Sequence, residues 1–431
     1  MSQSERSPDL LVIGGGVIGL AVAWRARERG LSVTVLDRGE LGRGTSHVAA
    51  GMLAPVAEVE FGEAGRRVLA LGLCSSGMWP AFAQQLEDAS GIEVGLLRTG
   101  TLLVARDDDE ASELDRQSTF RDSLGLRSER LRPSEARALE PAIAPTIRRA
   151  LRAPDDHSVD PRAVLRALRR ACEVAGVRLE EHTPVARIET DRAGERVTGV
   201  LLAGGDSRPD TVRPAGAVLI AAGPWVQEIG GLPAHARVPV RPVKGQILRL
   251  RDPAGPGLLN GVVRFEGGYL VPRRDGRYVL GATVQERGFN LAPEVGGVYE
   301  LLRDAHEVLP GVSELEIEEL SVGLRPGTPD NAPAIGGGAL EGLSWATGHH
   351  RNGILLAPVT AELAVATVTG GGGMRAGEEP FDGLLEACDP LRFVPGAGAE
   401  AGERTGGAAA RGDPARIGAN RDEEAPVASG A

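Results

Sequence analysis

Residues 9–37 read DLLVIGGGVIGLAVAWRARERGLSVTVLD, and this stretch decides the fold class of the chain. Residues 10–13 form a short apolar run of the kind found in buried parallel strands. Residues 17–29 carry the apolar spacing of a helix, and residues 32–36 predict a second strand that ends at Asp37. Strand, glycine turn, helix and strand in this order are typical of a Rossmann-like dinucleotide-binding unit.

The glycine turn at residues 14–19 has the pattern G-x-G-x-x-G. Gly14 permits the tight turn, Gly16 lets a pyrophosphate approach the backbone, and Gly19 lets the helix pack closely on the strand. We place Gly15 in the same phosphate-binding loop, where the helix start offers free N–H groups. Asp37 can accept hydrogen bonds from a ribose diol and would repel a 2′-phosphate, so we expect FAD or NAD rather than NADP.

The glycine pattern is a weak signal by itself, because the chain has 60 glycines and a glycine-rich structural turn is the alternative. The flanking strands, the helix and the terminal acid strengthen the dinucleotide interpretation.

Composition excludes several classes of function. The chain has 431 residues, enough for two domains, and its 59 acidic against 48 basic residues give a net charge of −11, which argues against a nucleic-acid partner. Cys74, Cys172 and Cys388 are scattered, and the histidines lack metal spacing, so we expect no disulfide framework and no metal site. The start of the chain has no basic region before an apolar run, so we expect a cytoplasmic protein without a membrane partner.

The order of predicted helices and strands along the chain predicts an α/β fold with two domains. Short alternating strands between residues 238 and 320 indicate an antiparallel sheet inserted into the Rossmann-like domain. We expect a cofactor-binding domain from residues 9–85, 150–235 and 321–394, a substrate-binding domain from residues 86–149 and 236–320, and a disordered tail at residues 395–431. The tail is poor in large apolar residues and is excluded from the functional interpretation.

The sequence shows no convergent set of histidine, cysteine and carboxylate side chains for acid–base or nucleophilic catalysis. Tyr269, Arg325 and Arg351 stand out instead. If Arg325 and Tyr269 face one pocket, they can hold a carboxylate through charge-assisted hydrogen bonds. The alternative for a single arginine is a surface ion pair that contributes little.

A flavin cofactor would explain the missing acid and base, because a hydride can pass directly from a substrate carbon to the flavin. The backbone N–H groups of Asn352, Gly353 and Ile354, at the start of a helix, are placed to stabilise the negative charge of a reduced ring.

Nine segments of the chain, in order, resemble the D-amino-acid oxidase-like FAD oxidoreductases, and within them the branch of bacterial glycine oxidases of thiamine biosynthesis. The segments are GGGVIG, GTSHVAAGML, RTGTLLVA, DDHSVDPRAVL, VLIAAGPW, PVKGQILRL, GGYLVPRRDGRYVLGAT, GLRPGTPDNAPAIG and GHHRNGILLAP. The resemblance covers roughly residues 9–393. It implies a D-amino-acid oxidase-like fold and oxidation of a small amine such as glycine by FAD and O2, through an imine, to glyoxylate, ammonia and peroxide.

The resemblance also implies roles for individual residues. Arg325 would grip the substrate carboxylate with help from Tyr269, and Arg351 would line the substrate and flavin site. The remaining positions would surround the cofactor: Asp37 and Arg38 at the adenosine ribose, Val185 at the adenine, Thr45, Ser46, Ala50, Gly51 and Met52 at the flavin, and Gly223 and His349 in segments beside it.

Two departures from the family pattern bear on substrate and cofactor. Relatives carry a methionine near the position of Val284 and a histidine near that of Gly267, which leaves the substrate range open. Some relatives attach flavin through a cysteine near GLRPGT; this chain has none there, so we expect noncovalent FAD.

Three hypotheses follow from the resemblance: a glycine oxidase, a quinone-linked D-amino acid dehydrogenase of the same fold, and a flavin-binding protein without turnover. The family also implies a homo-oligomer, as a tetramer, and transfer of the imine to a thiazole synthase.

Overall fold

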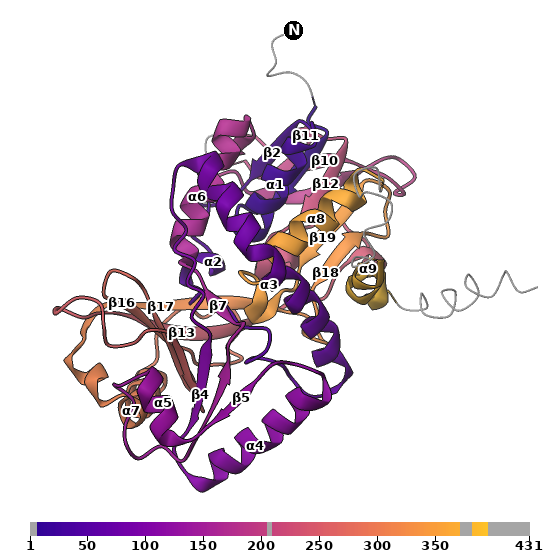
Figure 1. Ribbon diagram of the computed structural model, residues 1–431. Helices are drawn as coiled ribbons and strands as arrows, with labels where there is room; N and C mark the ends of the chain where they lie inside the picture. Colours follow the sequence, from indigo (N-terminus) through magenta and orange to yellow (C-terminus); the bar gives the residue numbers. More distant parts are fainter. Residues whose placement is uncertain (1–6, 205–208, 371–381, 395–431) are drawn as a thin grey trace, which may run out of the picture. The chain divides into compact units, whose positions relative to one another are not determined.

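Two large β-sheets organise the computed structural model, which describes residues 7–204, 209–370 and 382–394 (Figure 1). The strands of the first sheet are, in spatial order, β18 (Ala334–Gly337), β19 (Leu343–Thr347), β12 (Ala217–Ile220), β1 (Leu10–Ile13), β2 (Val33–Leu36) and β8 (Arg178–Glu180). All pairs are parallel except β18 with β19. β1 lies between β12 and β2 and is buried on both faces, as its continuous apolar sequence predicts.

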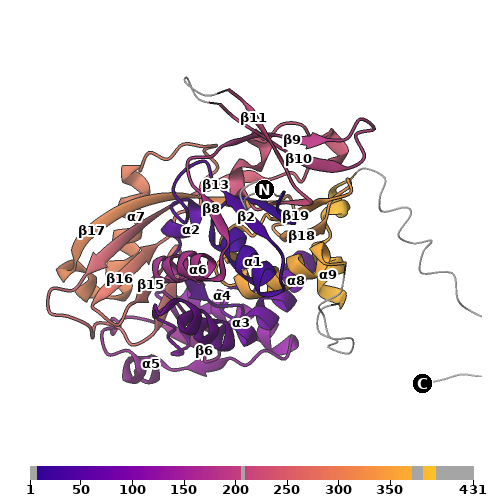
Figure 2. The same cartoon turned by 90° about the horizontal axis from the view of Figure 1, so that it is seen from above.

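Helices cover this sheet and bury its central strand. They are α1 (Val17–Glu28), α3 (Gly62–Ser90), α6 (Pro161–Ala175) and α8 (Ala357–Val368). Figure 2 shows α1 between α6 and α8, and both neighbours contact it extensively. This sandwiched position explains why α1 is apolar almost all round instead of having one polar face.

The second sheet is mostly antiparallel and has its own hydrophobic core. Its strands are, in spatial order, β17 (Glu316–Gly327), β13 (Arg241–Arg251), β16 (Arg277–Gly281), β15 (Gly268–Pro272), β14 (Val262–Phe265), β4 (Thr101–Ala105), β6 (Arg149–Ala153) and β5 (Glu129–Leu131). The helices α4 (Asp108–Ser123), α5 (Pro133–Leu139) and α7 (Val295–Val308) lie with these strands in the lower half of Figure 1. The apolar side chains of α7 pack on β13, β15 and β16.

The remaining elements are short. They are α2 (Thr45–Val48), β3 (Met52–Leu53), β7 (His157–Ser158), β9 (Val185–Thr190), β10 (Val197–Leu202), β11 (Thr211–Pro214), α9 (Asp382–Cys388) and the 3₁₀ turns η2 (Gly223–Glu228), η3 (Ala234–Ala236), η4 (Pro310–Glu314), η5 (His350–Asn352) and η6 (Pro390–Phe393).

The predicted α/β class, with a parallel sheet and a second, antiparallel one, is confirmed. The division into two domains stays a prediction, and β17 runs across the boundary expected at residue 320. The predicted tail at residues 395–431 lies outside the described residues. None of the helices in the described ranges has both the length and the hydropathy of a membrane span.

An ion pair joins helix α6 to strand β17 of the second sheet. Arg162, at the start of α6, donates to both carboxylate oxygens of Glu319 on β17, at 2.9 and 2.8 Å. These hydrogen bonds, opposed by partial burial and helped by Ser321, lower the pKa of Glu319 to about 2. The Glu319 side chain is 39% exposed, so we expect a small contribution, below about 1 kcal/mol.

This pair makes stability depend on pH in an acidic window. Because the folded-state pKa of Glu319 lies below the ordinary 4.5, its contribution is complete above pH 4.5 and disappears as the pH falls toward 2. We expect Glu319→Gln to reduce the acid-induced loss of unfolding free energy, measured by urea denaturation at pH 6 and pH 3. Glu316→Gln, at an exposed position of the same strand, is the control. An unchanged pH dependence in Glu319→Gln would contradict the assignment.

Candidate active site

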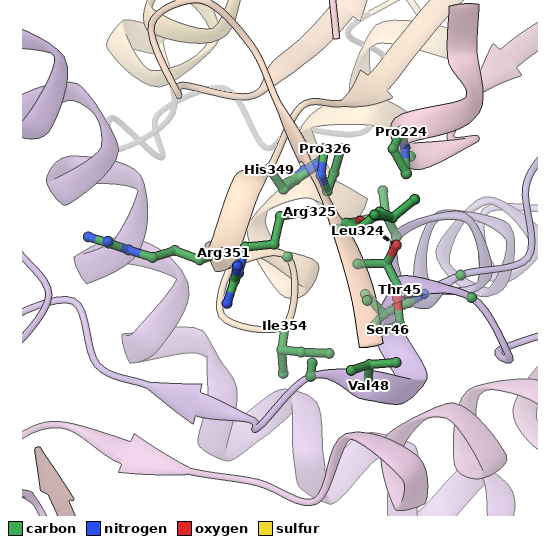
Figure 3. Close-up of a pocket in the computed structure, with 18 of the residues that line it drawn as sticks. Thr45, Ser46, Val48, Pro224, Leu324, Arg325, Pro326, His349, Arg351 and Ile354 are labelled. Atoms are coloured by element: carbon green, nitrogen blue, oxygen red, sulfur yellow. Dashed lines mark hydrogen bonds between the residues drawn. The ribbon is translucent and has the colours of Figure 1, made fainter. Parts of the chain in front are cut away.

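A cavity of about 990 Å³ connects the glycine turn to the second sheet. It begins at the carboxyl end of β1, where ligands bind in open α/β sheets, and reaches Tyr269 on β15 and Arg325 on β17. Figure 3 shows a part of its wall, where residues of α2, β17 and the segment around η5 face one another.

The glycine turn leaves no space for side chains at two of its positions. Gly14 has φ +107°, and a β-carbon there would lie 2.5 Å from the carbonyl oxygen of Ala221. A β-carbon on Gly19 would collide with the carbonyl oxygen of Gly14. Gly14 and Gly16 line the cavity, while Gly15 and Gly19 are buried and do not appear among its lining residues. The exposed edge of the turn therefore presents backbone to the cavity.

Asp37 braces this turn. Its two carboxylate oxygens accept hydrogen bonds from the backbone N–H groups of Gly15 at 2.7 Å and Gly39 at 2.9 Å. Asp37 and Arg38 both line the cavity. Arg38 pairs with Glu228 at 2.7 Å and lies over the Trp225 ring, so η2 holds this arginine beside the turn.

The segment around α2 forms the middle of the cavity wall. Ser46 accepts a hydrogen bond from the Val17 N–H at 3.1 Å, and Thr45 donates to the carbonyl of Leu324 at 2.6 Å (Figure 3). α2 is thus tied to the start of α1 and to β17. The predicted residues Ala50, Gly51, Met52, Val185 and Gly223 also line the cavity.

Two glycines in the second sheet make room for the polar side chains predicted to bind a carboxylate. A β-carbon on Gly245 would lie 2.5 Å from both terminal nitrogens of Arg325, and one on Gly281 would lie 2.9 Å from the Tyr269 hydroxyl. The arginine and the tyrosine therefore lie close over the backbone of β13 and β16. The sheet brings the two predicted residues together on the cavity wall.

Backbone carbonyls orient the Arg325 guanidinium. Its Nη1 donates to the carbonyls of Lys244 at 3.3 Å and Thr283 at 3.0 Å. Burial lowers its pKa, although Tyr269 opposes that shift. Burial raises the pKa of Tyr269, so this hydroxyl remains a neutral donor at neutral pH.

The Arg351 side chain does not lie beside the Arg325 side chain. In Figure 3 its side chain extends away from Arg325. Its Nη2 lies 2.7 Å from the Glu60 carboxylate and donates to the carbonyl of Glu58 at 3.1 Å. Burial lowers the pKa of Arg351, but the carboxylates of Glu58 and Glu60 outweigh burial and raise it. Arg351 lines the cavity, as predicted, while its charge is paired with the segment that follows β3.

Of the three residues before α8 whose backbone N–H groups were predicted to stabilise a reduced ring, two line the cavity. Gly353 and Ile354 line it, whereas Asn352 does not and its N–H donates to the carbonyl of His349 at 2.8 Å. His349 also lines the cavity, and burial lowers its pKa to about 3 while its Nε2 pairs with Thr360. This imidazole is therefore neutral at neutral pH.

Comparison with known proteins identifies the family. Residues 9–367 match the family model described as FAD dependent oxidoreductase, which covers most of the chain. The chain belongs to this family of FAD dependent oxidoreductases. Its solved relatives include the glycine oxidase of Geobacillus kaustophilus, with 33% identity, a TM-score of 0.76, and coverage of 84% of this chain and 94% of that one. The D-amino-acid oxidase-like fold predicted from the resemblance is thereby confirmed.

Curated relatives have two kinds of name. The glycine oxidase of Geobacillus kaustophilus is 34% identical over 362 residues, which is 84% of this chain and 92% of the relative. The bifunctional protein ThiO/ThiG of Synechocystis sp. is 35% identical over 395 residues, which is 90% of this chain but 55% of the relative. The chain thus spans about half the length of the bifunctional relatives and nearly all of the glycine oxidases it matches.

The cavity fits the family's cofactor. The turn at Gly14 and Gly16 presents bare backbone at a helix start, which suits a pyrophosphate, and Asp37 stands beside it at the end of β2. The cavity continues from there past α2 to Arg325, so a long dinucleotide would reach the carboxylate-binding pair. The predicted FAD is therefore the cofactor that this family and this site support. Cys74, Cys172 and Cys388 are not among the lining residues, in agreement with noncovalent binding.

Sequence reasoning missed part of the wall. Gly245, Gly281, Arg264, Glu58 and Glu60 were not identified as site residues. The two glycines did leave a signal, because an isolated glycine within a strand pattern often marks a close approach. The charged residues left none, because their place depends on how strands and loops pair.

The glycine under Arg325 can be tested. In Gly245→Ala, the added methyl group displaces a guanidinium that is already held by two carbonyls. We expect acetate to bind the FAD-loaded protein about tenfold or more weakly, because the charge-assisted pair to the carboxylate is misplaced. The measurement is a titration of the flavin absorbance with acetate. Gly77→Ala, at an open position of α3, is the matched control. An unchanged acetate affinity in Gly245→Ala would refute the role of Gly245 in making room for Arg325.

Proposed function

We propose that the protein is an FAD-dependent glycine oxidase that also accepts other small amines. The observation that carries this proposal is the Arg325 and Tyr269 pair, which lies on the wall of the cavity that begins at the glycine turn. Glycine oxidases at 34% and 33% identity, aligned over nearly their whole length, support the same substrate.

The reaction converts glycine to an imine, which water hydrolyses to glyoxylate and ammonia. Bound FAD supplies the acceptor for the two electrons that leave the substrate, and O2 then takes them up with two protons to give hydrogen peroxide. No side chain has to act as a nucleophile in this reaction.

The chain's own task is to position the substrate. Arg325 and Tyr269 hold the carboxylate, which fixes the α-carbon and the amine relative to the cofactor. Burial lowers the pKa values of His349 and His350 to about 3, so both imidazoles are neutral at neutral pH. They add no positive charge to that of Arg325 and Arg351.

The proposal predicts the behaviour of Arg325→Ala. Removing the guanidinium should lower kcat/KM for glycine about 100-fold or more, because Tyr269 alone remains for the carboxylate. High glycine concentrations should partly restore the rate, because the loss is mainly in binding. Peroxide release under air is the measurement, and Arg192→Ala, on the exposed surface, is the control.

The same assays separate the competing functions. A quinone-linked dehydrogenase would reduce a dye without consuming oxygen, and a protein without turnover would retain oxidised FAD when glycine, sarcosine or D-alanine is added without air. Either result in the FAD-loaded parent would overturn the oxidase assignment. Glycine and D-alanine differ by one methyl group, which a pocket distinguishes by only about 1–3 kcal/mol, so both should be tested.

The proposal extends to the fate of the imine. The relatives named ThiO/ThiG unite two functions in one polypeptide, which supports a thiazole synthase as the partner that receives the imine. A homo-oligomer and a cytoplasmic location complete the proposal, and the three free cysteines are compatible with a reducing compartment.

A further inference from the structure

The cavity has a second cationic cluster beside the Arg325 and Tyr269 pair. Arg264 on β14 and Arg351 on η5 both line the cavity, and the Glu58 carboxylate lies between them. We call these three residues the distal cluster. Nothing in the proposed reaction with glycine requires it.

Strand pairing puts Arg264 close to the substrate position. Arg264 is the direct partner of Tyr269 in the antiparallel pairing of β14 with β15, so the two side chains lie on the same face of the sheet. Arg264 Nη1 donates to the carbonyl of Ala57 at 2.8 Å. Its Nε is buried and has no hydrogen-bond partner in the described part of the chain. Arg264 thus retains an unused donor beside the cavity.

The backbone before Glu58 is held on both sides by buried charged groups. The Asp156 carboxylate accepts the N–H groups of Val56 at 3.1 Å and Ala57 at 2.8 Å. The Arg121 guanidinium donates to the carbonyls of the same two residues, both at 2.9 Å. Four hydrogen bonds therefore fix the two residues that precede Glu58, and the two from Arg121 are charge-assisted.

The Glu58 carboxylate lies within ion-pair distance of both arginines, at distances too long for a hydrogen bond. It lies 3.7 Å from Nη2 of Arg264 and 3.8 Å from Nε of Arg351, and its side chain is 11% exposed. Glu58, Tyr269 and Arg325 all line the same cavity.

We propose that the Glu58 carboxylate lies where a second substrate carboxylate would bind, between Arg264 and Arg351. Glu58 thereby restricts the enzyme to amines with one acidic group. A substrate with a second carboxylate, such as an amino or imino dicarboxylate, would meet the Glu58 charge and two arginines that are already paired. Without that charge, Arg264 and Arg351 would form a second anion site. This inference rests on the proposed function for its substrate class.

Binding to the FAD-loaded protein tests the inference without turnover. Acetate, malonate and succinate are titrated against the flavin absorbance in the parent and in Glu58→Gln, which keeps the size of the side chain. We expect Glu58→Gln to bind malonate or succinate about tenfold or more tightly relative to acetate than the parent does, because a like charge has been removed from the second site. Unchanged preference for both dicarboxylates would overturn the inference.

Two further variants show whether the distal cluster is responsible. Glu93→Gln removes an exposed carboxylate that is not among the lining residues of the cavity, and should leave the preference near that of the parent. Glu58→Gln combined with Arg264→Gln should lose the gain, and a gain that persists there would refute the role of Arg264. Thermal melts show that each variant is folded, and Glu58→Ser replaces Glu58→Gln if the latter does not fold.

Turnover then connects the binding result to the substrate. If the parent oxidises glycine, Glu58→Gln should raise kcat/KM for iminodiacetate relative to glycine by a similar factor. If the parent does not oxidise glycine, the proposed function fails, while the acetate and dicarboxylate titrations still decide whether Glu58 blocks a second anion site.

Discussion

The close contact between α1 and the turn after β1 is the constraint on which the site depends. It requires that Gly19 has no side chain, since a β-carbon there would meet the carbonyl oxygen of Gly14, and Gly14 likewise has no room beside the carbonyl oxygen of Ala221. Asp37 then holds the turn through the N–H of Gly15. The cavity starts from this fixed edge, and the side chains of Ser46 and Thr45 tie α2 to the start of α1 and to β17.

The second sheet applies the same principle to the substrate end. Gly245 and Gly281 let Arg325 and Tyr269 lie against the sheet, where backbone carbonyls orient the guanidinium. The cavity thus has the positive charge of Arg325 at the end predicted to bind a carboxylate, and neutral imidazoles in its lining. Such a site organises a small anion and leaves the redox step to the cofactor.

Much of this architecture could be predicted from the sequence, because its signals are local. The strand, glycine turn and helix around Gly14 follow from short-range patterns, and Tyr269 and Arg325 stood out within recognisable segments. Arg264 could not be found this way, since its position depends on the register of β14 with β15. Glu58 depends on contacts with Asp156, nearly a hundred residues later in the chain.

Strand β17 has a consequence beyond its place in the sheet. It accepts the Thr45 hydroxyl at Leu324 and carries Arg325 at the next position. α2, which carries Thr45, belongs to the wall expected to contact the flavin. Leu324 and Arg325 are adjacent on β17, so their side chains lie on opposite faces of the strand. Leu324 is hydrogen-bonded to the segment expected to contact the flavin, and Arg325 is predicted to bind the substrate. The hydrogen bond to α2 and the predicted substrate-binding arginine are therefore one peptide unit apart on β17, so this strand connects the two parts of the cavity wall through its backbone.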